Sequence, residues 1–146
     1  MKKTNRITKF LAITGTILVS IPILAPIVFT IIRLVSAGDF QLDYLMPAEI
    51  GLLVLIGGVL LIWAAIRSRL YLKWIAWSSG VAVFLILSGQ GLAIVTGLAS
   101  GQVEATGWQF RIVMASIVGY DLAVIALLIG GILLCIRLIH HTSNNT

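Results

Sequence analysis

Residues 112–136 read IVMASIVGYDLAVIALLIGGILLCI, an apolar run whose one charged residue is Asp121. About 20 residues of helix cross the hydrocarbon core of a bilayer, so this run is long enough to span one. Three further apolar runs occupy residues 10–32, 47–66 and 74–99. Because lipid offers no partner for exposed backbone groups, and four short spans cannot close a barrel, each run is expected to form a helix.

The composition supports the same class of protein. Of the 146 residues, 60% are hydrophobic and 10% are charged, whereas soluble domains average about 45–50% apolar and about 25% charged residues. A soluble domain this small could not bury so many apolar side chains. We therefore exclude a soluble enzyme, a disordered chain and a nucleic-acid-binding module. We expect one transmembrane domain over residues 1–146, with the lipid bilayer as its surroundings and no nucleic acid as a partner.

The short connections between the runs require neighbouring helices to be antiparallel, which predicts an all-α, integral membrane four-helix bundle of up-down-up-down topology. Eight cations and no acid fall on one side of it: Lys2, Lys3, Arg6, Lys9, Arg67, Arg69, Lys73 and Arg137. The other side has two cations, Arg33 and Arg111, beside four acids, Asp39, Asp43, Glu49 and Glu104. The positive-inside rule then predicts that both termini are cytoplasmic. A basic chain with short loops is typical of a bacterial plasma membrane.

A cleaved signal peptide is the alternative interpretation of the N-terminus, since Val35-Ser36-Ala37 resembles a cleavage site. The apolar run at residues 10–32 is longer than the roughly 7–15 residues of a signal peptide core. We therefore expect the first run to be retained as a helix.

Small residues recur at helical spacing in the third and fourth runs, where they allow helix backbones to approach closely. The candidate packing positions are Gly89, Ala93, Gly97 and Gly101, and Ala115, Gly119 and Ala123. With residues 100–111 as the turn, Gly119 should lie level with Leu92 and Ala115 with Thr96. The alternative is the general enrichment of glycine and alanine in membrane helices. A second pattern, LIGGVLL at residues 55–61 and LIGGILL at residues 128–134, is interpreted as a coincidence.

Asp121 is the residue that most needs an explanation. It lies ten residues after Arg111, which places it ~15 Å into the bilayer as helix. A charged aspartate at the bilayer centre costs about 2.5–3.5 kcal/mol on insertion scales. No lysine or arginine of the chain falls at that depth, so we expect a carboxyl group that is protonated, or close to titrating, at neutral pH.

Counting residues inward from the outer ends of the runs predicts a polar layer at the depth of Asp121. Its members are Asp121, Gln90, Pro22, Pro26, Gly57 and Gly58. Such a layer is typical of transporter sites, which lie at irregularities near the bilayer midplane. However, Asp121 lies about 200° around its helix from Gly119, so it should face the first helix, the second helix or another subunit. There it could donate a hydrogen bond to a carbonyl freed by Pro22 or Pro26, which would be a structural role.

Enzyme chemistry has little support in this sequence. His140 and His141 lie in the polar tail, and Cys135 is the single cysteine. We therefore expect no catalytic residues, no metal and no cofactor. The remaining hypotheses are an accessory, assembly or protective subunit of a larger membrane system, and a homo-oligomeric small transporter or channel coupled to protons or cations through Asp121. The partner would be a larger membrane protein in the first case and the chain itself in the second.

Overall fold

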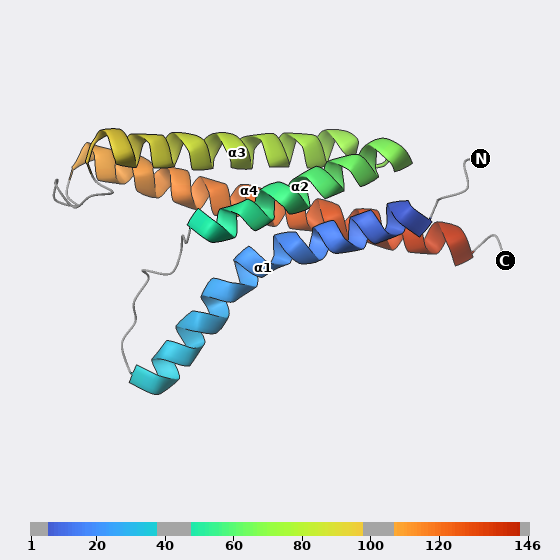
Figure 1. Cartoon of the computed structure of the whole chain (residues 1–146), viewed down its shortest axis with the longest axis horizontal. Helices are drawn as coiled ribbons and strands as arrows, with labels where there is room; N and C mark the ends of the chain where they lie inside the picture. The colour runs from blue at the N-terminus through green and yellow to red at the C-terminus, as the bar shows by residue number, and fades with distance from the viewer. Residues whose placement is uncertain (1–5, 38–47, 98–106, 144–146) are drawn as a thin grey trace.

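The structure, a computed structural model, describes residues 6–37, 48–97 and 107–143, and the regular elements in these ranges are all helices. In these ranges the helices are α1 (Arg6–Ala37), α2 (Ala48–Ser68), α3 (Leu72–Val95) and α4 (Trp108–Ser143) (Figure 1). Each of these four helices contains a segment that is long and apolar enough to cross a membrane. The predicted all-helical fold and its four candidate spans are therefore confirmed.

The ends of three helices differ from the ends of the predicted apolar runs. α1 and α4 continue beyond the predicted spans at both ends, because the charged and polar residues there are also compatible with helix. α3 is shorter than predicted and ends at Val95 rather than Ala99. The N–H groups of Thr96 and Gly97 bond back to the carbonyls of Leu92 and Ile94, and Gly97 has a left-handed φ of 74°. Glycine in this conformation is a common way to end a helix.

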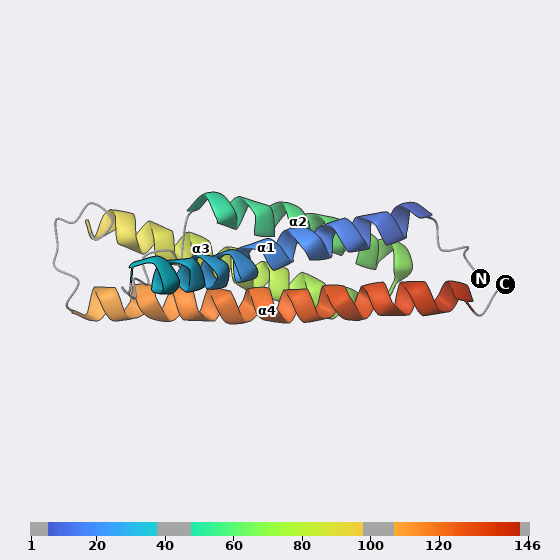
Figure 2. The same cartoon turned by 90° about the horizontal axis from the view of Figure 1, so that it is seen from below.

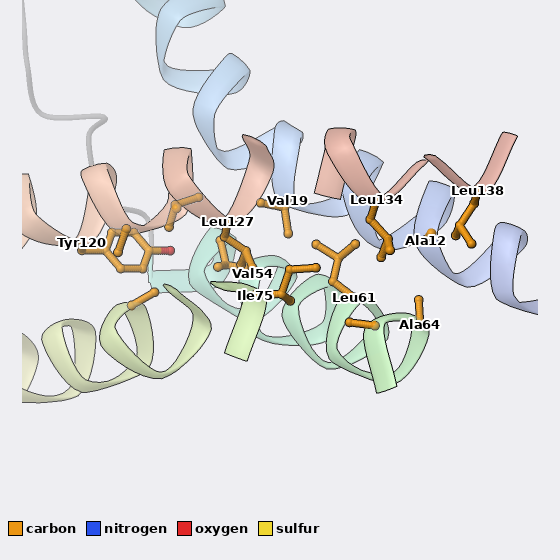
Figure 3. Close-up of a cluster of buried hydrophobic side chains, with 14 residues drawn as sticks. Ala12, Val19, Val54, Leu61, Ala64, Ile75, Tyr120, Leu127, Leu134 and Leu138 are labelled. Carbon is orange, nitrogen blue, oxygen red and sulfur yellow. The ribbon is translucent and has the colours of Figure 1, made fainter. Parts of the chain in front are cut away.

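The helices pack in the cyclic order α1, α2, α3, α4. α1 contacts α2 and α4, and α3 also contacts α2 and α4, while no contact joins α1 to α3 within the described residues. The core runs along the centre of this arrangement (Figure 3). Its largest fully buried side chains are Leu61, Ile75, Leu127, Leu134, Val19 and Val124. The N-terminal end of α1 and the C-terminal end of α4 lie at the same end of the molecule (Figures 1 and 2).

α1 bends in its middle, and its C-terminal half diverges from the other helices (Figure 1). Pro22 and Pro26 occupy the middle of this helix, where each removes a backbone donor and clashes with the preceding turn, so the bend is the one that the two prolines predict. Many apolar side chains of the diverging half are exposed outside the bundle: Leu24, Ile27, Val28, Ile31, Ile32 and Val35.

Two glycine pairs set the distances between the helices. In α2, a Cβ on Gly57 would meet Val19 and the carbonyl oxygen of Gly15 in α1, and one on Gly58 would meet Ser79 in α3. In α4, Gly130 similarly contacts α3 and Gly131 contacts α1. The two similar stretches at residues 55–61 and 128–134 thus share one structural role, since each pair lies between α1 and α3 with one glycine against each.

Candidate functional site

Asp121 lies near the middle of α4, about 20 Å along the helix from Trp108. Its side chain is half-buried, and the preceding Tyr120 belongs to the buried core (Figure 3). In the described part of the chain, no hydrogen bond or ion pair to the Asp121 carboxyl is formed. Among the described residues, Asp121 therefore does not form the predicted hydrogen bond to a carbonyl freed by Pro22 or Pro26.

The contacts of α4 fix the direction in which Asp121 points. Gly119 packs on Leu85 and Ser116 packs on Gly89, so both face α3. At about 100° per residue, Asp121 lies about 200° from Gly119 and points away from α3. On the far half of α4, Gly131 and Cys135 both contact Thr16 of α1. Asp121 lies within about 80° of these two residues, so it belongs to the side of α4 that faces α1.

However, α1 begins to diverge from the bundle near the level of Asp121. Gly131 packs against Thr16, and in an antiparallel pair the level of Asp121 corresponds to Pro26 on α1. Beyond that level α1 leaves the bundle (Figure 1). The residues that surround Asp121 on the outward side are exposed: Val118, Leu122 and Ile125. We call Val118, Asp121, Leu122 and Ile125 the open face of α4.

The pairing of α3 with α4 differs from the predicted one. Gly119 lies against Leu85 rather than level with Leu92, and Gly89 lies against Ser116. The reason is that α3 ends at Val95 and α4 begins at Trp108, each four residues earlier than the apolar runs indicated. This shift places Gln90 about 9 Å from the level of Asp121 along the helix axis.

The other members of the predicted polar layer are also spread along the bundle. Gly58 lies against Leu127, six residues and about 9 Å from Asp121. Gly57 lies beside Gly15 and Val19 at a similar level. The register between α1 and α4 places Pro26 at the level of Asp121, and Pro22 lies one turn away from Pro26. The structure therefore does not bring Asp121, Gln90 and the glycine pair into one layer.

The predicted packing residues of the third and fourth runs have different environments. Gly89, Gly119 and Ala123 lie in or beside the interior of the bundle, and Ala93 is half-buried. Ala115 is exposed, and the neighbouring Ser116 takes the position against Gly89. Gly97 ends α3, and Gly101 lies outside the described residues.

A polar cluster that was not predicted from the sequence lies at the opposite end from the α3–α4 connection. The guanidinium of Arg137 in α4 donates to the Tyr71 hydroxyl at 3.3 Å and lies 5.7 Å from the centre of the Tyr71 ring. One turn along α3, Trp74 Nε1 donates to the carbonyl of Ala126 at 3.0 Å. Tyr71 reaches this position from a tight turn in which Arg69 and Tyr71 both have left-handed φ angles. The signal in the sequence is the group of aromatic residues between Tyr71 and Trp77, which lies beside the cations Arg67, Arg69 and Lys73.

Among the described residues no group of three or more His, Cys, Asp and Glu residues could hold a metal ion. Comparison with family models, with curated proteins and with solved structures finds no match for this chain.

Proposed function

We propose that the chain is a small multi-pass membrane protein that acts as an accessory, assembly or protective subunit of a larger membrane system. The observation that best supports this proposal is the divergence of α1 (Figure 1). It leaves the open face of α4, which includes Asp121, without a neighbouring helix from the described part of the chain. A transmembrane helix of a partner could occupy the position that α1 vacates. It could also offer a polar group to the Asp121 carboxyl, since an intramembrane acid is costly without one.

The proposed arrangement in the membrane is an up-down-up-down bundle with both termini in the cytoplasm of a bacterial cell, inserted in the plasma membrane. Exposed cations support this orientation, because Arg6, Arg67, Arg69, Lys73 and Arg137 all belong to one end of the bundle. Short loops rich in lysine and arginine stay on the cytoplasmic side.

Affinity purification of the tagged chain from its native membrane in mild detergent, followed by mass spectrometry, tests the accessory role. We expect a stoichiometric membrane partner, and we expect Asp121→Leu to remove it. Asp121→Asn should keep the partner, because an amide can still donate and accept hydrogen bonds.

Ser88→Leu is the matched control for this experiment. Ser88 is another polar residue within a span; it is exposed, and its hydroxyl donates to the Leu85 carbonyl of its own helix. Partner recovery should be unchanged in this variant. Recovery of the chain only with itself would contradict the accessory role.

The second candidate function is a homo-oligomeric small transporter or channel coupled to protons or cations. The half-buried position of Asp121 at the edge of the open face favours it, because symmetric copies could place several such carboxyls along one pathway. Here Asp121→Asn should give a well-inserted protein that no longer conducts protons or cations in reconstituted vesicles. The two functions are thus distinguished by the Asn variant, which retains the partner in one case and loses the flux in the other.

A further inference from the structure

The end of the bundle formed by the α2–α3 turn and the end of α4 carries positive charge without any acid of its own. Arg67, Arg69, Lys73 and Arg137 lie there, and all four side chains are exposed. The five acids of the chain are elsewhere in the sequence: Asp39, Asp43, Glu49, Glu104 and Asp121. Among the described residues, none of these four cations forms an ion pair with an acid of the chain, so their charge is available to an anion from outside.

One part of this cationic end is fixed in place. Arg137 donates to the Tyr71 hydroxyl and lies over the Tyr71 ring. A guanidinium has five N–H donors, so this contact leaves most of them available to an oxygen-rich anion. Tyr71 is held in turn by the start of α3, since its carbonyl accepts the N–H of Ile75 at 3.0 Å.

The aromatic residues around Arg137 are those expected near the height of lipid headgroups. Trp74 is anchored on α4 through the Ala126 carbonyl and through close packing on Gly130. Trp63 and Trp77 are exposed near the same end of the bundle. Tryptophan and tyrosine collect at the membrane–water interface, and lysine and arginine just outside such a belt attract anionic lipids.

We propose that Tyr71, Trp74 and Arg137, with the neighbouring Arg69 and Lys73, form a binding site for the headgroup of an anionic phospholipid. The phosphate accepts hydrogen bonds from the N–H groups of Arg137 and of the adjacent cations. The indole of Trp74 lies beside the part of the lipid nearest to its headgroup. The charge of the site favours an anionic lipid over a zwitterionic one, and among the described residues no acidic side chain pairs with its cations. This inference does not depend on either function proposed for Asp121.

Native mass spectrometry of the detergent-purified chain tests the site, with phosphatidylglycerol and phosphatidylcholine as competing probes. We expect preferential retention of phosphatidylglycerol, and a retention that falls as salt is raised. Arg137→Gln should weaken phosphatidylglycerol binding about fivefold, the effect of removing one cation near a lipid headgroup. Arg137→Lys should keep most of the binding because it keeps the charge.

Arg111→Gln is the matched control, since it removes one exposed arginine from the opposite end of the same helix. It should leave phosphatidylglycerol binding unchanged. Tyr71→Phe keeps the ring and removes the hydroxyl that orients Arg137, and it should weaken binding less than Arg137→Gln does. Equal retention of the two lipids, or an equal loss in Arg111→Gln and Arg137→Gln, would overturn the proposal.

Discussion

Single glycines determine how closely α1 and α2 approach. A Cβ on Gly15 would lie 3.0 Å from the carbonyl oxygen of Gly57, and a Cβ on Gly57 would lie 3.0 Å from that of Gly15. Each backbone therefore occupies the space in which the other's side chain would stand. In lipid, helices gain stability mainly from such close packing, because burial of apolar groups provides little driving force between them.

Gly57→Ala should destabilise the protein by about 1–3 kcal/mol, the usual cost of inserting a group into a packed interior. The clash involves backbone on both sides, so a side-chain rotation cannot relieve it. Unfolding by sodium dodecyl sulfate, followed by circular dichroism, measures the change. Gly91→Ala is the control, because a Cβ there has no neighbour within 4 Å and alanine is the better helix former. Equal stability of both variants would show that the α1–α2 contact is looser than the structure indicates.

Among the elements, α1 is the one that gives the molecule its open side. Its N-terminal half packs on α2 and α4 through Gly15, Thr16 and Val19, and its C-terminal half leaves the bundle beyond the bend (Figure 1). Pro22 and Pro26 are one turn apart, so both missing donors weaken the same side of the helix. The shape of this helix therefore decides whether the open face of α4 is available to a partner.

Replacing both prolines by alanine should restore the two backbone hydrogen bonds and straighten α1. The distance between spin labels at Val35 in α1 and Ile112 in α4 should then shorten, because a straight helix would continue along α4. Double electron–electron resonance in reconstituted bilayers measures this distance. A variant with the prolines intact and the same two labels is the reference. An unchanged distance would mean that contacts other than the prolines hold the bend.

The sequence predicts the helices well because a span needs a long apolar run and this chain has four. It predicts the ends less well, since residues 96–99 are as acceptable to lipid as the helix before them. Gly97, with its left-handed φ, ends α3 before the end of the apolar run, and a hydropathy pattern does not detect that conformation. The direction of Asp121 follows from the periodicity of one helix and could be predicted. The polar layer could not, because it depends on the register between helices, which the early end of α3 changes.

At the scale of the whole molecule, the two ends of the bundle differ in charge. The end that contains Arg137 and the α2–α3 turn is strongly basic, whereas the connection between α3 and α4 contains Glu104 and the one before α2 contains Asp39 and Asp43. A bacterial plasma membrane retains basic loops on its cytoplasmic side. The proposed orientation, with both termini in the cytoplasm, would place the proposed lipid site in the cytoplasmic leaflet.

Cysteine labelling in intact cells tests this orientation. The background is Cys135→Ser, which removes the single native cysteine and keeps a group that can contact Thr16. Ala105→Cys, in the connection between α3 and α4, should react with a membrane-impermeant maleimide in intact cells. Ser143→Cys, at the end of α4, should react only after the cells are opened, because that end should lie in the cytoplasm. Labelling of Ser143→Cys in intact cells, with Ala105→Cys protected, would reverse the orientation and move the proposed lipid site to the outer leaflet.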